Sequence, residues 1–284
     1  MNRTVRQMLL KAAETLRSAG VDSPLLDAEL MLAKALKVTR THLLGHPESP
    51  VPGEPAELFL LWIKRRAARE PLAYILCEKE FYGLTFYVDP SVLIPRPETE
   101  FLVDAGLQYL KSQPRPKAAD IGTGSGAVAV TLAKYAPHAA IWATDVSSRA
   151  LTIAKRNAVQ LGVAERIHFA EGDLLAPFAG EKFNLIISNP PYIPSGEIPA
   201  LMPEVSRYEP KSALDGGPDG LNIYHRIITN APEYLLPGGI IAFEVGQGEG
   251  EPVRAMLLAA GFSNVKAAKD YAGIERVVTG EMPE

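Results

Sequence analysis

The feature that most constrains the fold is a regular alternation of short apolar segments and amphipathic segments after residue 116. Buried strands are predicted at AADIG, AIWATDV, RIHFAEGD and FNLIIS, with helices at 126–135 and 147–161. A helix at 221–235, the strand GGIIAFEVG, a helix at 250–260 and two short strands near Val265 and at 276–279 follow. This alternation predicts an α/β fold with a seven-stranded, mostly parallel sheet covered by helices on both faces. The last two strands are close enough in sequence to form an antiparallel edge.

The residues before this region follow two other patterns. From Thr4 to Glu70 apolar residues recur at helical spacing, which predicts a small helical bundle, and Ser23-Pro24 supplies a cap and a first-turn proline. The segment EFYGLTFYVDPSVLIP, 80–95, is rich in aromatic and β-branched residues, with Gly83 placed for a hairpin turn. We therefore expect a helical domain at 1–75, a β-hairpin linker at 76–95 and an α/β domain at 96–284.

Composition excludes several classes of protein. The chain has 284 residues, 47% of them hydrophobic, so it can bury a large core. Its single cysteine, Cys77, excludes an internal disulfide framework and a cysteine-rich metal cluster, and no metal site is expected. No apolar run approaches the roughly 20 residues of a membrane-spanning helix. The N-terminal segment MNRTVRQMLLKAAE lacks the apolar core of a signal peptide, so we expect a cytoplasmic protein.

Charge gives no sign of a general affinity for nucleic acid. The formal net charge is −4, so there is no global positive field to attract a phosphate backbone. The most basic stretch is KRRAAR, 64–69, which we interpret as the solvated end of a helix. A surface for the ribosome, RNA or an acidic partner is the alternative at this stretch.

A glycine-rich turn, DIGTGSG, follows the first strand of the α/β region. Its glycines allow positive φ and let a ligand approach bare backbone, while the next helix offers free N–H groups to an anion. Asp145 ends the second strand 19 residues after Gly126, where an acid can accept both hydroxyl protons of a ribose. A helix N-cap is the other interpretation of Asp145. The pair predicts a nucleoside cofactor, and the glycine spacing alone leaves NAD and S-adenosylmethionine open. The candidate residues of the turn are Asp120, Gly122, Thr123, Gly124, Ser125 and Gly126.

Asp173 and Leu174 follow the third strand. The carboxylate could accept from an adenine amino group, and the leucine could pack on the ring, at the strand edge where open α/β sheets bind ligands. An acid in a surface loop is the structural alternative.

The fourth strand ends in NPPY, Asn189 to Tyr192. Pro190 and Pro191 restrict the backbone and leave their carbonyls free of local N–H competition. The Asn189 oxygen and a proline carbonyl could therefore accept both protons of an NH₂ group, and Tyr192 offers a flat wall for a planar amide or base. These two hydrogen bonds would direct the lone pair of the NH₂ nitrogen toward an electrophile. If the electrophile is a sulfonium methyl, no strong general base is needed, and positioning can supply much of the rate.

At this point the chain resembles the class I S-adenosylmethionine-dependent methyltransferases, whose amino-methylating members carry an Asp/Asn-Pro-Pro-Tyr/Phe motif here. The segment PLAYILCEKEFYGLTFYVDPSVLIPRPETE, together with DIGTGSGAVAV, SNPPYIP and ALDGGPDGL, is similar to the peptide chain release factor glutamine methyltransferases, the PrmC or HemK family. The resemblance implies S-adenosylmethionine as cofactor and class 1 peptide chain release factors as partners. The methylated group would be the side-chain nitrogen of the glutamine in their Gly-Gly-Gln motif.

The resemblance also implies roles for particular residues. The N-terminal bundle would dock the rest of the release factor, and Arg96 and Glu98 of IPRPETE would line the substrate cleft unless they only start a helix. The family commonly has glycine where this chain has Cys77, which alters the turn if that position needs positive φ. The residues from Gly122 to Gly126, with Asp120, Asp145, Asp173, Leu174 and Asn189, would contact the cofactor, and Asn189, Pro190, Pro191 and Tyr192 would form the glutamine pocket.

Two other functions remain open from sequence. An adenine or cytosine amine in nucleic acid would suit NPPY chemically, although it would require base flipping and the chain is acidic. A non-catalytic partner of release factors or ribosomes could keep the nucleoside site for stability alone. We expect a monomer that binds neither nucleic acid directly nor membranes.

Overall fold

The N-terminal part of the protein is a helical unit. The computed structural model describes residues 3–284, and one compact unit comprises the N-terminal residues up to Cys77 together with Met202–Tyr208. Apolar side chains at helical spacing, among them Leu16, Met31 and Phe59, are fully buried in its core. Its helices are α1 (Val5–Ser18), α2 (Pro24–Leu36), α3 (Arg40–Gly45), α4 (Gly53–Ala67), α5 (Leu72–Leu76) and α9 (Pro203–Ser206).

The helix starts of this unit follow local rules. Thr4 and Gln7 form a reciprocal capping box at α1, and Pro24 occupies the first turn of α2 as predicted. Ser23 precedes α2, but its side chain makes no capping hydrogen bond. Its backbone carbonyl still accepts from Asp27 N, at 2.9 Å.

The basic stretch 64–69 lies at the end of α4, as expected, but its arginines are not simply solvated, so that part of the interpretation was wrong. Arg66 is 7% exposed, and its guanidinium donates to Asp27 at 2.7 Å and to Glu204 at 2.9 Å. Arg69 donates twice to Glu204, at 2.6 Å each. The acidic partners lie on α2 and α9, which are distant in sequence. They neutralise the arginine charges that the local sequence predicted to be solvated.

A short hairpin begins the second unit, which comprises Glu78–Leu201 and Glu209–Glu284. Strands β1 (Lys79–Phe81) and β2 (Leu84–Phe86) pair antiparallel with Phe81 opposite Leu84. Tyr82 and Gly83 connect them with φ of 52° and 71°, the left-handed pair of a tight hairpin turn. The hairpin is thus shorter than 80–95, because the rest of that segment is irregular.

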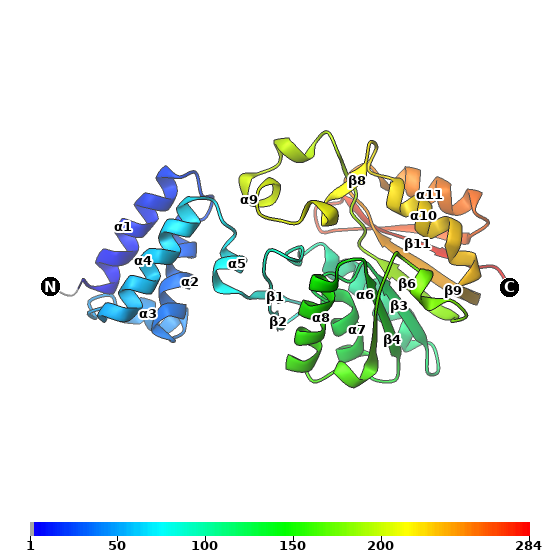
Figure 1. Ribbon diagram of the computed structural model, residues 1–284, viewed down its shortest axis with the longest axis horizontal. Helices are drawn as coiled ribbons and strands as arrows, with labels where there is room; N and C mark the ends of the chain where they lie inside the picture. The colour runs from blue at the N-terminus through cyan, green and yellow to red at the C-terminus, as the bar shows by residue number, and fades with distance from the viewer. Residues whose placement is uncertain (1–2) are drawn as a thin grey trace. The chain divides into compact units, whose positions relative to one another are not determined.

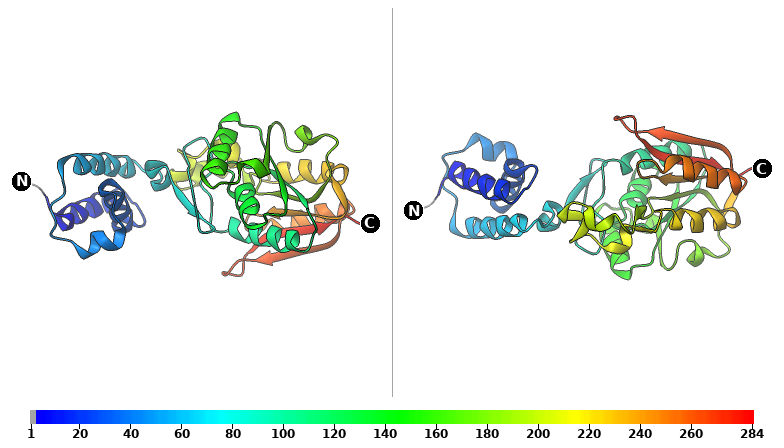
Figure 2. Two further views of the ribbon diagram at one scale, coloured as in Figure 1. Left: turned by 90° about the horizontal axis from the view of Figure 1, so that it is seen from below. Right: turned by 90° about the horizontal axis from the view of Figure 1, so that it is seen from above.

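A seven-stranded sheet forms the framework of the second unit (Figure 1). The strand order is β10-β11-β9-β6-β3-β4-β5, with β9, β6, β3, β4 and β5 parallel and β11 antiparallel to both neighbours. Figure 2 shows the β10–β11 pair at one edge, as the sequence predicted. The strands are β3 (Lys117–Ile121), β4 (Ala140–Asp145), β5 (Ile167–Glu171), β6 (Phe183–Ser188), β9 (Leu235–Glu244), β10 (Ser263–Lys269) and β11 (Glu275–Glu281).

Helices cover both faces of this sheet, and each face has its own apolar core (Figures 1 and 2). Successive residues of the central strands alternate between the cores: Ala118 lies in one and Ala119 in the other. Helices α6 (Thr99–Lys111), α7 (Ala127–Tyr135) and α8 (Ser148–Gln160) pack in the first core, and α10 (Asn222–Asn230) and α11 (Gly250–Ala259) in the second. The expected helix 221–235 ends early, at Asn230, where a 3₁₀ turn containing Pro232 leads into β9.

Candidate active site

The carboxyl ends of four adjacent strands bring the predicted site residues together. Because β6, β3, β4 and β5 are parallel neighbours, the segments that follow them share one edge of the sheet. A cavity of about 290 Å³ lies there, lined by Gly122, Gly124, Asp145, Asp173, Leu174 and Asn189 among others. A smaller adjoining cavity of about 50 Å³ shares Gly122, Gly124 and Asn189 and is also lined by Asp120, Thr123, Ser125 and Arg96.

The glycine loop has the backbone shape that its sequence predicts. Gly122, Gly124 and Gly126 have φ of 75°, 55° and 81°. Asp120 stabilises the loop through two hydrogen bonds. Its Oδ2 accepts from Thr123 Oγ1 at 2.6 Å and from the backbone N of Ala129 at 3.0 Å. Burial raises the pKa of Asp120 to about 7, against the opposing effect of these two donors.

Gly126 and Ser125 serve the packing of the helix that follows the loop. A Cβ at Gly126 would stand 3.1 Å from Ala154 Cβ, so this glycine allows α7 to approach α8 closely. The backbone carbonyl of Ser125 accepts from the buried Asn157 side chain at 2.8 Å. Asn157 also bonds both backbone polar groups of Tyr87 and so joins the loop to the segment after the hairpin.

Asp145 lies at the end of β4 and points toward the glycine loop. Its Oδ2 accepts from Gly124 N and its Oδ1 from Ser147 N, each at 2.9 Å. The N-cap of α8 is Ser147, whose hydroxyl accepts from Ala150 N, so Asp145 is not that cap. Burial raises the pKa of Asp145. A carboxylate has about four acceptor positions, so acceptor capacity for a ribose hydroxyl remains beside the backbone donors.

Asp173 and Leu174 line the larger cavity on the β5 side. The Asp173 carboxylate pairs with Arg226 of α10, a partner that the sequence did not indicate. Leu174 adopts a left-handed φ of 51°, and its carbonyl accepts from Thr144 Oγ1 at 2.9 Å. This bond holds the leucine at the wall of the cavity.

Asn189 stands where the two cavities meet. Its Nδ2 donates to the hydroxyl of Thr99, the first residue of α6, at 3.2 Å. The amide nitrogen is therefore engaged by the protein, and Oδ1 is the atom that can accept from a substrate.

A glycine-rich loop packs closely against Pro191 and Tyr192, the last two residues of NPPY. The short strands β7 (Ile193–Pro194) and β8 (Asp215–Gly217) pair in parallel and bring DGGPDG against NPPY. A Cβ at Gly216 would stand 2.8 Å from the Pro191 carbonyl oxygen, and one at Gly220 would stand 2.3 Å from that of Tyr192. Only glycine permits this approach, which accounts for the motif.

The remaining members of NPPY differ in exposure. Pro190 is buried, whereas Pro191 lines the larger cavity. Tyr192 packs against the second core, and burial raises the pKa of its hydroxyl. Tyr192 lines neither of the two cavities described here, so its role as a wall for the substrate stays a prediction.

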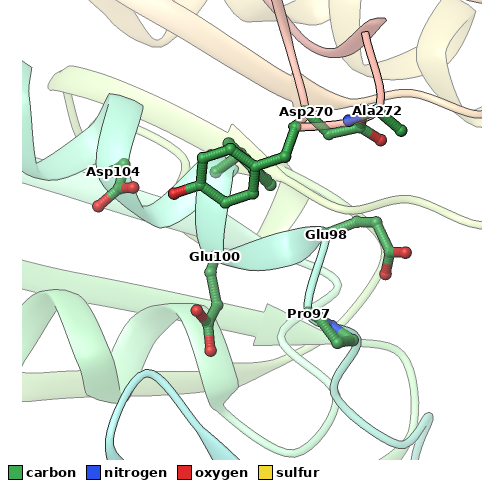
Figure 3. A pocket seen from close by; sticks show the side chains of 8 residues that line it. Pro97, Glu98, Glu100, Asp104, Asp270 and Ala272 are labelled. Atoms are coloured by element: carbon green, nitrogen blue, oxygen red, sulfur yellow. The ribbon is translucent and has the colours of Figure 1, made fainter. Parts of the chain in front are cut away.

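The structure separates Arg96 from Glu98. Arg96 lines the smaller cavity and pairs with the buried Glu209 at 2.5 Å. Glu98 lines a different pocket of about 290 Å³, between the start of α6 and the β10–β11 turn. Figure 3 shows Glu98 with Glu100 and Asp104 on the α6 side, and Asp270 and Ala272 on the other.

Glu244 is the residue near the site that sequence reasoning missed most clearly. It ends β9, the strand beside β6, and is 1% exposed. Burial raises its pKa to about 7, partly opposed by a hydrogen bond from Thr99. Its Oε2 has no hydrogen-bond partner within residues 3–284. The available signal was a carboxylate closing the apolar run IIAFE at the ligand-binding edge.

Two features are absent from residues 3–284. No helix in this range is long and apolar enough to cross a membrane. No group of three or more His, Cys, Asp or Glu residues in it is arranged to hold a metal ion.

Comparisons with known proteins cover nearly the whole chain. The model for the PrmC N-terminal domain matches residues 7–76, and that for the methyltransferase small domain matches residues 99–202. A release factor glutamine methyltransferase of Moorella thermoacetica is 44% identical over 274 residues, which is 96% of each chain. The protein of the same name from Geobacter sulfurreducens is 44% identical over 98% of this chain and 97% of its own.

Solved structures show the same fold at low identity. A methyltransferase of Pyrococcus furiosus matches with a TM-score of 0.53 and 21% identity, covering 72% of this chain and 92% of its own. The hMettl16 catalytic domain, solved in complex with a MAT2A 3′UTR hairpin, matches with a TM-score of 0.59 and 16% identity, over 81% and 82%.

Proposed function

This chain belongs to the family of release factor glutamine methyltransferases, and we propose from that membership what it modifies. It transfers a methyl group from S-adenosylmethionine to the side-chain amide nitrogen of the glutamine in the Gly-Gly-Gln motif of class 1 peptide chain release factors. The observation that carries the proposal is the position of Asn189, at the junction of the two cavities with its Nδ2 bonded to Thr99. That arrangement presents an oxygen acceptor to an NH₂ group.

The residues of the larger cavity fit the cofactor. Bare backbone at Gly122 and Gly124 suits the amino acid part, the Asp145 carboxylate suits the ribose, and apolar Leu174 suits the adenine ring. Asp173 is the candidate acceptor for the adenine amino group, although it is shared with Arg226. S-adenosylmethionine bound there supplies an electrophilic sulfonium methyl.

Asn189 and a proline carbonyl act on the nucleophile. The Asn189 Oδ1 accepts one proton of the substrate amide and the carbonyl accepts the other, which directs the nitrogen lone pair toward the methyl. The new N–C bond forms as the S–C bond breaks, and the excess proton then leaves to water. These two hydrogen bonds accelerate the chemical step only to the extent that they are stronger in the transition state than in the ground state.

The remaining assignments rest on the same family membership. Residues 1–75 dock the body of the release factor, 76–95 form the connecting linker and 96–284 carry the chemistry. Arg96 is the candidate substrate contact of IPRPETE, because it lines the smaller cavity beside Asn189, whereas Glu98 lies in a separate pocket. We propose a cytoplasmic monomer that does not act directly on nucleic acid.

The deciding experiment is mass spectrometry of a purified class 1 release factor after incubation with the protein and S-adenosylmethionine. One added methyl on the Gly-Gly-Gln glutamine is expected, and it should be absent when that glutamine is replaced by alanine. A DNA and RNA pool is assayed in parallel. Methyl found only on nucleic acid would overturn the substrate and keep the chemistry, and no transfer to either would overturn the enzymatic assignment.

A further inference from the structure

Two side chains behind Asn189 have no part in the function described so far. Thr99, at the start of α6, is 4% exposed, and its hydroxyl accepts from Asn189 Nδ2 at 3.2 Å. Glu244, at the end of β9, is 1% exposed, and burial raises its pKa against the opposing effect of a hydrogen bond with the same Thr99 hydroxyl. Glu244, Thr99 and Asn189, from elements distant in the sequence, thus form a series of three polar groups that ends at the substrate side of the cavity.

The protons in this series permit only one arrangement when Glu244 is ionised. A carboxylate accepts only, so the single proton of the Thr99 hydroxyl goes to Glu244. The hydroxyl oxygen can then only accept from Asn189, and the group that meets it must be the amide NH₂. The Asn189 Oδ1 is consequently turned away from Thr99, toward the substrate.

Protonation of Glu244 removes this constraint. A protonated carboxyl can donate to Thr99, which frees the hydroxyl proton to point at Asn189. The amide then gains by turning its oxygen to Thr99 and its NH₂ to the substrate. Two NH₂ groups would face each other, and the substrate nitrogen would lose an acceptor.

We propose that Thr99 and Glu244 are positioning residues that fix the side-chain amide of Asn189 in the orientation needed to accept a proton from the substrate amide. This proposal rests on the proposed function for its chemical consequence. The orientation itself is a property of the protein without substrate, so it can be tested separately.

The surroundings of Glu244 place its ionisation within reach of ordinary pH. Burial dominates and raises its pKa to about 7, while one carboxylate oxygen finds no donor among the described residues. Tyr224 Oη donates to the Glu244 main-chain carbonyl, at 2.8 Å, and not to its carboxylate. The other charged or titratable groups that act on it are Arg96 and Glu98 before α6, Arg276 on β11 and Tyr192 after β6.

The first test compares substitutions at Thr99 in methyl transfer to the release factor. Thr99→Val keeps the shape and removes the hydroxyl, so kcat should fall at least 10-fold while cofactor Kd changes less than about 3-fold. Thr99→Ser restores the hydroxyl and should recover most of kcat. Equal kcat for Thr99→Val and wild type would overturn the proposal.

The second test uses pH and separates Glu244 from other buried acids such as Asp120. Wild-type kcat should fall as pH drops below about 7, in step with the pKa of Glu244. Glu244→Gln keeps an oxygen that accepts from Thr99 but cannot titrate, so this acidic limb should disappear. Glu244→Met offers no acceptor and should be slow at every pH. An unchanged acidic limb in Glu244→Gln would contradict the role of Glu244.

The third test needs no substrate. Selective ¹⁵N labelling of asparagine gives side-chain signals, and the Asn189 signal is the one missing from Asn189→Ala. At pH 8.5 one Asn189 Nδ2 proton should show slow exchange, and this protection should be lost in Thr99→Val and in wild type below pH 6. Asn157, bonded to the Ser125 and Tyr87 carbonyls, is the internal control that should not respond. Protection that persists in Thr99→Val overturns the inference even if the release factor is not the substrate, and an inactive wild type with the predicted signals overturns only the proposed function.

Discussion

The glycine loop after β3 and the arginine end of α4 both bury an ionisable side chain, but the hydrogen-bond partners of the two side chains lie at very different distances along the chain. Asp120 takes its donors from Thr123 and Ala129, three and nine residues away. Arg66 takes its carboxylate acceptors from Asp27 and Glu204, 39 and 138 residues away. The local partners of Asp120 shape the loop that lines the cavity, whereas the distant partners of Arg66 join α4 to α2 and α9. We therefore expect substitutions in the first region to change binding and rate, and substitutions in the second to change stability.

The largest expected effect is on stability at the distant network. Arg66→Ala leaves the buried Asp27 without its cation, and breaking a buried pair in this way typically costs about 3–5 kcal/mol. Urea unfolding measures the loss. The matched control is Arg65→Ala, because Arg65 is more exposed and pairs with the nearby Glu70, and that loss should stay below about 1 kcal/mol. Similar losses for the two variants would show that the network does not hold the fold.

Asn189→Ala should give the largest effect on rate. Loss of the acceptor that acts on the nucleophile should lower kcat by about 10²- to 10³-fold, the range seen when one transition-state hydrogen bond is removed. Cofactor affinity should fall less, and the unfolding free energy should change by no more than about 1 kcal/mol. Steady-state methylation and calorimetry measure these quantities. Turnover like that of the wild type would remove Asn189 from the mechanism.

The same contrast in distance explains what could be predicted from sequence. The alternation of strands and helices, the glycine turn and the position of Asn189 are set by local pattern, and the structure has them where they were predicted. The Thr99–Asn189 bond joins residues 90 positions apart, and no local pattern announces it. KRRAAR was misinterpreted for the same reason, because its partners lie on α2 and α9.

Asp145→Ala tests whether a substitution beside the glycine loop weakens binding of the cofactor. Charged hydrogen bonds of the kind expected to ribose hydroxyls contribute about 1.5–3 kcal/mol, so cofactor Kd should rise by roughly 10- to 100-fold. Isothermal calorimetry with S-adenosylmethionine gives the value directly. Unchanged affinity would mean that Asp145 serves only backbone N–H groups of the protein, among them Gly124 N and Ser147 N.

The pH dependence of stability tests whether two local donors outweigh burial at Asp120. Its pKa is about 7 in the folded protein and about 3.9 in an unfolded chain, so the folded state holds a proton that the unfolded state releases. Stability should therefore fall as pH rises from about 4 to about 7, by up to roughly 1.4 kcal/mol per pH unit for this proton, and level off above.

Asp120→Asn cannot bind or release that proton, so it no longer contributes to the pH dependence of stability. Urea unfolding at pH 5 and pH 7.5 should show a smaller loss of stability in the variant than in wild type, with Glu244 still contributing its own share. An identical loss in both proteins would mean that Thr123 and Ala129 keep Asp120 ionised in the folded state.

The smallest expected effect lies at Cys77, where a local backbone rule operates outside the active site. Cys77 follows α5 with φ of 55° and ψ of 33°, a left-handed conformation that costs a residue with a Cβ about 1–2 kcal/mol. Glycine avoids that cost but loses about 0.5–1 kcal/mol more free energy to chain entropy on folding. Cys77→Gly should thus raise the unfolding free energy by up to about 1 kcal/mol, whereas Cys77→Ala keeps the Cβ and should give no gain. If Cys77→Gly gives no gain and Cys77→Ala is less stable than wild type, the weak bond from the Cys77 thiol to the Tyr74 carbonyl, at 3.5 Å, offsets the backbone strain.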